Sequence, residues 1–351
     1  MRVFRGFHHR DIAPACALTI GNFDGVHRGH QAMLALLINE ARHRGVASCV
    51  MTFEPHPRDF FAQRAADAAA TGARALRSPS PAPSGGGPGT PGPGAVMTAP
   101  TRIATLRDKL SELERCGIDQ TVVLRFDARL AGLSPQTFID QVLVDGVHAR
   151  YVLVGDDFRF GAKRAGDYAM LDAAGDARGF DVARMMSYEV HGARVSSSAV
   201  RAALAAGDMA HAAALLGRPY AISGRVQHGR KLGRELGFRT LNLRFGHPRP
   251  AAMGIFVVRV FGLAETALPG VASLGRRPTV DASGRVLLET HVLDWPASLG
   301  AEGGYGRLIR VELLAKLHDE RRYASMAELR AAIADDTAQA RSWFLAHGEN
   351  A

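Results

Sequence analysis

The residues best suited to chemistry stand close together near the N-terminus, in Thr19–His30 (TIGNFDGVHRGH). His27 and His30 are three residues apart, so on a helix both imidazoles would lie on one face of its first turn. Gly21 follows a short apolar run, and the apolar spacing after His27 predicts a helix. A strand, a glycine turn and a helix N-terminus form an anion site, because free backbone N–H groups and the helix dipole favour phosphate. Two imidazoles beside such donors can stabilise charge that develops on a phosphorus atom.

A second group of candidates stands in Val195–Arg201 (VSSSAVR). A serine-rich helix start supplies hydroxyl and backbone N–H donors, and an arginine one turn later adds a planar cation suited to phosphate. An ordinary helix N-cap would explain the serines equally well. These residues alone leave both interpretations open.

Three features nearer the C-terminus also carry chemical groups. The glycine-spaced stretch Gly229–Gly237 (GRKLGRELG) would let backbone N–H groups approach a phosphate. Phe238–Asn242 (FRTLN) follows it and contributes two side-chain oxygens. Glu289 stands in the apolar stretch Leu287–His291 (LLETH), where a carboxylate is unfavourable unless it has a partner or a task. An edge strand that faces water would be the alternative explanation for this glutamate.

Several of these strings resemble known families. Gly21–His30 (GNFDGVHRGH) resembles the (H/T)xGH signature of nucleotidyltransferases, in the form that bacterial FAD synthetases carry. Phe53–Pro57 (FEPHP), Gly155–Gly161 (GDDFRFG) and the serine-rich segment are similar to further motifs of that family, in the same order. FRTLN and the strand around Glu289 resemble riboflavin kinases, whose motif reads PTAN. The chain is thus similar to bacterial bifunctional riboflavin kinase/FAD synthetases over nearly its whole length.

The resemblance implies roles for residues in the N-terminal half. His27 and His30 would act at the transition state of adenylyl transfer, and Arg201 would hold the departing pyrophosphate. The implied ATP and phosphate contacts are Gly21, Asn22, Phe23, Asp24, Gly29, Ser197 and Ser198. The implied flavin contacts are Phe53, His56, Pro57, Asp157 and Phe158, with Asp156 beside them.

In the C-terminal half, the resemblance makes Glu289 the general base that takes a proton from the ribityl hydroxyl as it attacks ATP. The other implied contacts here are Gly229, Gly233 and Gly237 for phosphate, and Thr240 and Asn242 for Mg²⁺.

Two positions depart from the family pattern. Arg239 stands where the family usually has proline, which would fix the turn before Thr240. Arg276 stands where the family often has threonine, near the flavin side. The first departure puts the loop geometry in question more than the chemistry.

Alternating strands and helices must position the N-terminal motifs. The apolar runs 18–20, 46–53, 121–126 and 151–154 predict strands, and helices are predicted from about His27, over 103–117 and from Ser134-Pro135 to about Val144. Alternation of this length predicts a parallel sheet, in which ligands bind outside the carboxyl ends of the strands. The two prolines of FEPHP predict an extended turn rather than a helix there.

The pattern changes near Gly217–Tyr220 (GRPY) to short strands separated by glycine turns. Strands are predicted at Ile222–Gln227, Gly254–Val260, Val286–Leu293 and Leu308–Ala315. Their spacing predicts an antiparallel barrel or sandwich, and Ser325–Glu328 is a capping box that opens a closing helix with Leu329, Ile333, Trp343 and Phe344 on its apolar face.

The predicted fold class is therefore α/β: a Rossmann-like, doubly wound parallel-sheet nucleotidyltransferase domain over 1–216 and an antiparallel β-barrel riboflavin kinase domain over 217–351. Within the first, Ala, Pro, Gly and Ser dominate Ala62–Pro100, which offers almost no large apolar side chain. We predict that this stretch is a disordered insertion, on which the resemblance is silent.

Composition narrows the classes of protein to which this chain can belong. The chain has 351 residues and a formal net charge of +9, but its basic residues are scattered, so no nucleic-acid partner is predicted. It has no apolar run of about 18 residues and no apolar signal-peptide core, which predicts no membrane span and a cytoplasmic location. Cys16, Cys49 and Cys116 form neither a disulfide framework nor a zinc pattern, and we expect buried, reduced thiols.

The expected function is phosphorylation of riboflavin to FMN, followed by adenylylation of FMN to FAD, with ATP as co-substrate and Mg²⁺ in both steps. Two alternatives stay open: a nucleotidyltransferase for another phosphorylated metabolite, and a non-catalytic flavin- or nucleic-acid-binding protein. A monomer or weak homo-oligomer is expected.

Overall fold

The computed structural model describes residues 1–75, 99–186, 188–190, 193–228, 237–276, 286–300 and 302–348. It divides into two compact units that interleave along the chain. Unit 1 comprises Met1–Asn22, Leu37–Pro100 and Asp119–Met185, and unit 2 comprises Phe23–Leu36, Thr101–Ile118 and Met186–Ala351. The predicted domains, in contrast, are divided at a single point between residues 216 and 217.

Unit 1 is built on a six-stranded sheet with strand order β1-β4-β3-β2-β5-β6, in which every pairing is parallel. The strands are β1 (Arg2–Arg5), β2 (Cys16–Ile20), β3 (Ala47–Glu54), β4 (Gln120–Arg125), β5 (Ala149–Gly155) and β6 (Asp181–Met185). The strand order reverses at β2, which lies between β3 and β5. The predicted doubly wound parallel sheet is confirmed, and β1 and β6 are additions to the predicted strands.

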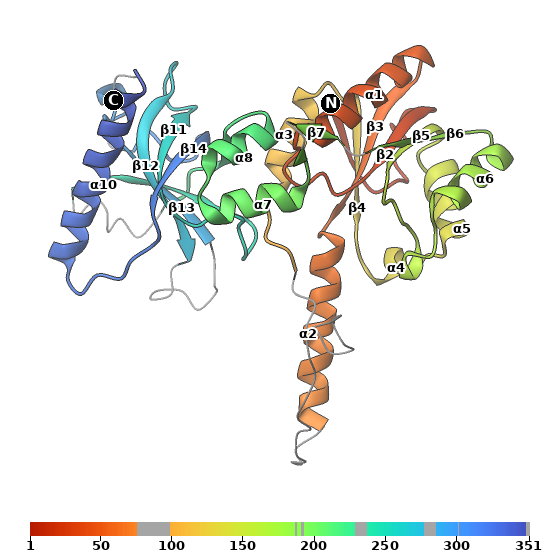
Figure 1. Ribbon diagram of the computed structural model, residues 1–351, viewed down its shortest axis with the longest axis horizontal. Helices are drawn as coiled ribbons and strands as arrows, with labels where there is room; N and C mark the ends of the chain where they lie inside the picture. Colours follow the sequence, from red (N-terminus) through yellow and green to blue (C-terminus); the bar gives the residue numbers. More distant parts are fainter. Residues whose placement is uncertain are drawn as a thin grey trace. The chain divides into compact units, whose positions relative to one another are not determined.

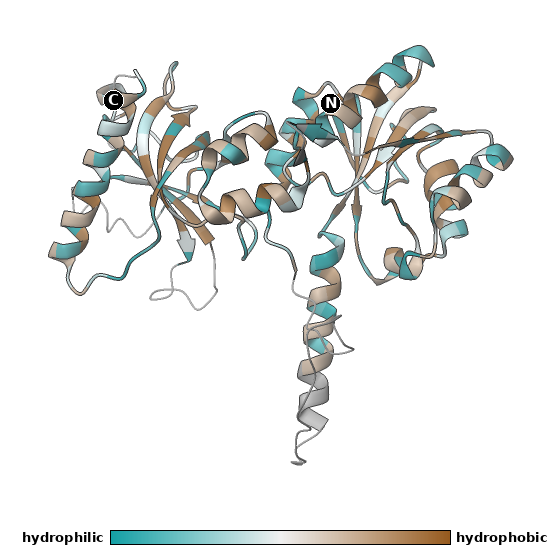
Figure 2. Ribbon diagram, viewed as in Figure 1, coloured by the Kyte–Doolittle hydropathy of each residue, from teal (hydrophilic) through white to brown (hydrophobic). Residues whose placement is uncertain are grey.

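Apolar residues concentrate in the strands of this sheet, as Figure 2 shows. All five residues of β2 are buried, which suits a strand covered on both faces. Cys16 and Cys49 are buried free thiols, and Cys116 is free and partly exposed.

The helices associated with this sheet are α1 (Arg28–His43), which continues from unit 2, α2 (Pro57–Ala75), α4 (Ala128–Ala131), α5 (Pro135–Phe138) and α6 (Tyr168–Arg178), with the shorter turns η1 (Ile139–Val144) and η2 (Ala162–Arg164). Ser134 caps α5 with Pro135 in its first turn, as predicted, and the helix continues to Val144 as the π-helical turn η1. On α1, Leu34, Leu37 and Ala41 form the buried stripe that their spacing predicts.

Helix α2 corrects two expectations. It begins at Pro57, so the second proline of FEPHP starts a helix instead of preventing one. Proline is well tolerated there because the first helical N–H has no intrahelical partner in any case. The helix then runs through Ala62–Ala75, which we expected to be disordered, and it extends away from the sheet (Figure 1). Alanine, the best helix former, dominates this stretch; the rest of the predicted insertion, from 76 to 98, lies outside the described residues.

Unit 2 contains a six-stranded antiparallel sheet with strand order β10-β13-β12-β11-β14-β9. Its strands are β9 (Tyr220–Arg225), β10 (Thr240–Arg244), β11 (Gly254–Phe261), β12 (Leu268–Arg276), β13 (Val286–Val292) and β14 (Leu308–His318). An antiparallel bridge between Gln227 and Asn242, with an N–H···O distance of 2.9 Å, connects the two edges of the sheet. This curling confirms the predicted barrel; the sequence pattern did not predict β10 and β12 as strands. The short strands β7 (Glu189–Val190) and β8 (Ala193–Arg194) form a separate pair.

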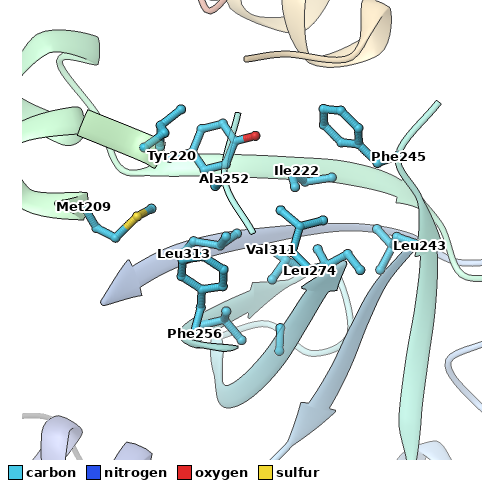
Figure 3. Close-up of a cluster of buried hydrophobic side chains, with 14 of the residues drawn as sticks. Met209, Tyr220, Ile222, Leu243, Phe245, Ala252, Phe256, Leu274, Val311 and Leu313 are labelled. Atoms are coloured by element: carbon cyan, nitrogen blue, oxygen red, sulfur yellow. The ribbon is translucent and has the colours of Figure 1, made fainter. Parts of the chain in front are cut away.

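Inside the curl lies the main apolar core of unit 2 (Figure 3). Phe256, Leu274, Val311 and Leu313 pack there with side chains from the other strands, and Tyr220 and Met209 belong to the same cluster.

In its described part, unit 2 also contains the start of α1, the 3₁₀ turn η3 (Ala297–Leu299) and the helices α3 (Leu106–Arg115), α7 (Ser197–Ala206), α8 (Met209–Leu216) and α10 (Met326–Ala346). Helix α10 lies along the antiparallel sheet (Figure 1), where Ala340 and Phe344 pack against Val257 and Val271. The predicted cap is confirmed, since the Glu328 N–H donates to Ser325 Oγ at 3.2 Å. No helix in the described part of the chain is long and apolar enough to cross a bilayer.

Candidate active sites

The loops of three motifs leave the parallel sheet at one edge. Thr19 of β2 pairs with Leu153 of β5, so the parallel strands deliver Gly21 and Gly155 to the same end of the sheet. The Gly21 N–H donates to the carbonyl of Met51 in β3 at 3.0 Å. Next to it, the Asn22 side-chain oxygen is buried without a hydrogen-bond partner among the described residues. In a doubly wound sheet, this edge beside the reversal of strand order is where ligands bind.

The FEPHP motif forms the end of β3 and the start of α2. The Phe53 ring lies edge-on to Phe126, with the ring centroids 5.7 Å apart. His56 is buried, and its Nδ1 accepts the N–H of Arg58 at 3.1 Å, so this imidazole caps α2. Pro57 is the first residue of that helix. The Nδ1 atom of His56 is therefore committed to the local fold.

The GDDFRFG motif forms a tight turn after β5. The Phe158 N–H donates to the Gly155 carbonyl at 3.2 Å, and the carboxylates of Asp156 and Asp157 are exposed. The Phe158 ring stacks on Phe160 at a centroid distance of 5.5 Å. The turn leaves both acidic side chains accessible.

In unit 2, the turn before the histidines has a strained backbone. Phe23 and Val26 have φ values of 48° and 41°, and Gly25 between them has a φ of 87°. Non-glycine residues seldom adopt positive φ, and a β-branched residue such as valine does so least readily. A Cβ at position 25 would also lie 2.8 Å from Cγ2 of Ile103, so both conformation and space require glycine there. Backbone strain of this kind persists only where surrounding contacts hold it.

Asp24 is one of those contacts. Its carboxylate is 2% exposed and accepts the N–H groups of Ile103 and Ala104. It also accepts a bond of 2.7 Å from Nη2 of Arg201, while Nε of Arg201 donates to the carbonyl of Thr101 at 2.7 Å. Two of the three guanidinium nitrogens of Arg201 therefore bond to the protein itself.

The serine-rich segment is both a cap and part of this cluster. Ser196 caps α7 by accepting the Ala199 N–H at 3.2 Å, which is the simpler of the two interpretations of the sequence. Ser197 Oγ donates to the backbone carbonyl of Asp24 at 3.2 Å, and Ser198 is exposed. The structure therefore brings Ser197, Arg201 and Asp24 together.

The two histidines form a stacked pair at the N-terminus of α1. Their rings lie 3.7 Å apart with an interplanar angle of 16°, and the Phe23 ring is 4.9 Å from His30. His27 Nδ1 accepts the N–H of His30 at 3.3 Å, so His27 caps the helix and carries its own proton on Nε2. His30 Nδ1 is buried without a hydrogen-bond partner among the described residues. Gly29 is close-packed here, since a Cβ on it would lie 3.3 Å from the His27 ring.

Both imidazoles are neutral near pH 7. Burial lowers the pKa of His27 to about 4, because the charged form loses hydration; Asp24 opposes the shift and Arg201 adds to it. The pKa of His30 also lies well below its usual range, first through burial and then through His27, Lys109 and Arg201. Two neutral imidazoles beside a helix N-terminus can donate hydrogen bonds to a phosphate without competing for its proton.

Sequence reasoning missed the buried charges around this pair. Helix α3 was predicted from its leucines, yet it buries Asp108 and Lys109 along with Leu113. Arg218, after α8, donates to the carbonyls of Gly25 and Val26. An isolated Lys or Arg in an amphipathic stretch usually faces solvent, so the sequence holds no signal for these placements.

The predicted kinase residues meet on the antiparallel sheet. Asn242 of β10 pairs with Glu289 of β13, and Glu289 pairs on its other side with Ser273 of β12. Because strand neighbours alternate, Glu289 lies on the face opposite the buried Leu288 and Thr290. It is half-buried there, which differs from the core position that its apolar neighbours suggest.

The row of paired residues from Asn242 through Glu289 to Ser273 contains a side-chain oxygen that can accept a further hydrogen bond. Asn242 is 6% exposed, and its Oδ1 has no hydrogen-bond partner among the described residues. Thr240 lies on the same face, opposite His291. Gly237 has a φ of 88° and open space around it, whereas Gly229 and Gly233 lie outside the described residues.

Glu320 is a further carboxylate that sequence reasoning did not single out. It accepts a bond of 3.2 Å from Ser273 Oγ, and a Cβ on Gly275 would overlap it. Burial raises the pKa of Glu320, and the nearby charge of Glu289 adds to this shift. One acidic group, Glu289, therefore lies within the row from Asn242 to Ser273, and a second, Glu320, lies beside it.

Both arginines that depart from the family pattern bond to backbone carbonyls. The Arg239 guanidinium donates to the carbonyl of Gly300 at 3.0 Å and lies 4.7 Å from the centroid of Trp295. The Arg239 carbonyl in turn accepts from His291 Nδ1 at 2.8 Å. Arg276 donates to the carbonyl of Pro248 at 2.6 Å. The stretch before Thr240 is thus held by side-chain contacts in place of a proline ring.

Comparisons with known proteins agree with both halves of the chain. The riboflavin kinase family model matches residues 216–344, and the FAD synthetase model matches residues 9–75 and 90–199. A solved structure described as a macrolide-efflux protein from Streptococcus pneumoniae has 24% identity and a TM-score of 0.69, and covers 98% of this chain and 100% of its own. At that identity the likeness concerns the fold alone.

Curated relatives are similar over their full length. The bifunctional riboflavin kinase/FMN adenylyltransferase of Escherichia coli K12 is 43% identical, with 98% of each chain covered. Proteins of the same description from Pseudomonas fluorescens and Haemophilus influenzae are 41% and 36% identical, covering 97% and 98% of this chain and 97% and 99% of their own. The chain therefore belongs to the bifunctional riboflavin kinase/FMN adenylyltransferase family.

Proposed function

We propose that this chain transfers a phosphoryl group from ATP to riboflavin, giving FMN, and an adenylyl group from a second ATP to FMN, giving FAD and pyrophosphate. We assign adenylyl transfer to residues 1–216 and the kinase reaction to 217–351. The observation that carries the proposal is the stacked, buried and neutral pair of His27 and His30 at a helix N-terminus, in a chain that belongs to this family.

In adenylyl transfer, the FMN phosphate attacks the α-phosphorus of ATP in line, and pyrophosphate leaves. The substrate supplies the nucleophile, so the protein needs only to align the phosphates and stabilise charge. The Nε2–H of His27 and the imidazole of His30 donate to the oxygens of the reacting phosphate. Arg201 contributes Nη1 to the departing pyrophosphate, because its Nε and Nη2 are already bonded to Thr101 and Asp24.

The remaining contacts in this half follow the same chemistry. Backbone groups of the segment from Gly21 to Asp24 and at Gly29 meet the ATP phosphates, with Ser197 and Ser198 at the start of α7. The isoalloxazine ring of FMN packs against Phe53 and Phe158, with His56, Pro57 and Asp157 beside it.

In the kinase step, Glu289 accepts the proton of the ribityl primary hydroxyl as that oxygen attacks the γ-phosphorus and ADP leaves. Thr240 and Asn242 fit Mg²⁺, because Asn242 Oδ1 is a buried oxygen without a protein partner among the described residues. Mg²⁺ there would neutralise phosphate charge. Gly237, together with Gly229 and Gly233, supplies backbone donors to the phosphates.

The test is a time course of purified protein with riboflavin, ATP and Mg²⁺, resolved by liquid chromatography. Wild type should form FMN and then FAD. His30→Ala should lower FAD formation at least about 100-fold and leave FMN formation unchanged, since a transition-state donor is lost. Glu289→Gln should do the reverse, by about 100-fold or more.

Two exposed positions serve as controls: His43→Ala on the same helix as His30, and Glu265→Gln in unit 2. Both should behave like wild type. If His30→Ala and Glu289→Gln each lost both activities while their thermal unfolding stayed normal, the two-site assignment would be wrong. If FMN formed but never became FAD, the histidine pair would serve another acceptor.

A further inference from the structure

The turn from Phe23 to Val26 places the catalytic histidines, yet its backbone is unfavourable. Positive φ values at Phe23, Gly25 and Val26 immediately precede His27. Without external contacts such a turn would relax, and the imidazole that caps α1 would move with it. The contacts that hold the carbonyls of this turn are therefore part of what sets the position of His27.

Arg218 makes two of those contacts, while the Ser197 hydroxyl holds the Asp24 carbonyl. Its Nη2 donates to the Gly25 carbonyl at 2.8 Å, and its Nη1 donates to the carbonyls of Val26 at 3.2 Å and Leu216 at 3.0 Å. Its Nε lies 3.0 Å from the Glu112 carboxylate, and the two side chains are only 16% and 15% exposed. Burial lowers the pKa of Arg218, whereas the carboxylate of Glu112 favours its charged form.

A second side chain shares part of this arrangement. Gln31 Nε2 donates to the same carbonyls of Val26 and Leu216, at 2.9 and 2.7 Å. Gln31 does not contact the Gly25 carbonyl in these bonds, and it has no charge. Of these two side chains, only Arg218 joins the carbonyls of both Gly25 and Val26 to helix α3, through Glu112.

We propose that Arg218, oriented by Glu112, is a positioning residue for adenylyl transfer, which fixes the Gly25–Val26 turn and thereby the place of His27. The assignment deepens the proposed adenylyltransferase function and rests on it. Arg218 falls within the segment matched by the riboflavin kinase model, whereas the turn falls within the FAD synthetase match. A residue that belongs by sequence to the kinase half thus serves the other reaction.

Lysine cannot replace this arginine. The guanidinium presents five N–H groups in a rigid plane, which lets one side chain reach three carbonyls and a carboxylate at once. A lysine ammonium keeps the positive charge but has three donors around one point. Arg218→Lys therefore removes the geometry while it preserves the charge near His27.

The pH dependence of adenylyl transfer gives a second readout, and it depends on the charged groups that face the histidine pair. Asp24 lies on the same turn as His27, Arg201 comes from α7, Arg218 follows α8, and Lys109 of α3 acts on His30. Arg218→Lys leaves all these charges in place, so any rise in the pKa of His27 would report greater exposure of the imidazole. Protonation removes the cap acceptor on Nδ1, and the acid limb of adenylyl transfer should move to higher pH.

The experiment uses the full chain with FMN, ATP and Mg²⁺, and separately with riboflavin. Arg218→Lys should lower kcat for FAD formation about 10- to 100-fold, leave KM for ATP and FMN within about twofold, and leave riboflavin phosphorylation unchanged. Glu112→Gln should show a smaller loss in the same direction. Arg115→Ala is the matched control, because Arg115 contacts the same Glu112 at 3.3 Å but is 60% exposed; it should behave like wild type.

Three outcomes would overturn the proposal. Normal FAD formation by Arg218→Lys would show that the turn does not need the arginine. Equal losses of both activities with a lowered Tm would indicate a purely structural role. A lower kcat with an unmoved acid limb would mean that the imidazole stays buried without Arg218. Failure of the adenylyltransferase function itself is distinguishable, because wild type would then make no FAD from FMN.

Discussion

His27 combines two tasks that a single imidazole can perform only when neutral. Its Nδ1 must be unprotonated to accept the N–H of His30, and its Nε2–H must remain available as a donor. Burial supports both, because it lowers the pKa of His27 to about 4. The same burial makes the folded chain sensitive to acid, since a neutral buried histidine must gain its proton against this environment.

This sensitivity must lower the stability of the folded chain as the pH falls. Between about pH 6.5 and pH 4 the unfolded chain binds a proton at His27 and the folded chain does not, so the free energy of unfolding falls as the pH falls through this window. The loss amounts to about 2 kcal/mol at pH 5. His27→Asn keeps a capping oxygen and cannot titrate, so its Tm should fall less than that of wild type between pH 7 and pH 5.

Thermal unfolding at pH 7, 6 and 5 measures this difference. His43→Asn, at an exposed position of the same helix, should keep the wild-type slope. Identical slopes for wild type and His27→Asn would show that His27 does not titrate in this window.

At the residue scale, the sequence predicted which side chains carry chemistry better than it predicted their hydrogen-bond partners. The spacing of His27 and His30 and the helix after them was sufficient to expect a shared face. Arg201 was expected on phosphate, yet two of its nitrogens bond to Thr101 and to Asp24, which is 177 residues away. Bonds between residues so far apart in the sequence depend on the assembled fold, and the local periodicity of apolar residues does not predict them.

At the element scale, apolar runs predicted strands well and alanine-rich segments poorly. The run 121–126 appears as β4, Gln120–Arg125, whose apolar centre Val122–Leu124 is buried, as expected for a strand covered on both faces. Ala62–Ala75 has no such stripe, so its composition suggested disorder even though alanine favours a helix. β10 was not predicted as a strand because it is only five residues long, has just two large apolar residues, Leu241 and Leu243, and closely follows a glycine-spaced stretch.

The link between β10 and β13 yields a prediction about Arg239. Arg239→Ala removes the bond to the Gly300 carbonyl and the contact with Trp295. These contacts are worth about 1–2 kcal/mol together, so the start of β10 at Thr240 should loosen and riboflavin phosphorylation should fall roughly 5- to 30-fold. FMN adenylylation should not change.

Fluorescence gives an independent measurement of the same change. The chain has two tryptophans, so Trp343→Phe leaves Trp295 as the only tryptophan, whose emission can be excited selectively. In that background, Arg239→Ala should increase quenching of Trp295 by acrylamide, whereas Arg276→Ala, which removes the bond to Pro248, should not. Unchanged phosphorylation and unchanged quenching would show that Arg239 does not hold this segment.

At the scale of the whole molecule, the described part of the chain contains two six-stranded sheets whose chemistry differs with their topology. In the parallel sheet, strand ends gather glycine turns and helix starts at one edge, which suits binding of nucleotide phosphates. In the antiparallel sheet, the side chains that we assign to the kinase reaction include Asn242 and Glu289, which lie in one row across neighbouring strands with Ser273. The two sets of residues share no member, so each reaction should be removable without the other.

This separation predicts complementation between damaged chains. His30→Ala should convert riboflavin to FMN and stop, and Glu289→Gln should leave riboflavin unchanged. An equimolar mixture should form FAD from riboflavin, because FMN carries a phosphate that is readily hydrated and can leave one chain and reach another. FAD should appear after a longer lag than with wild type, since FMN must first accumulate in solution.

The measurement is a chromatographic time course of the mixture and of each variant alone. If the mixture accumulated FMN without FAD, while Glu289→Gln alone converted added FMN, then FMN would stay bound to the chain that made it, and the predicted exchange between chains would be wrong.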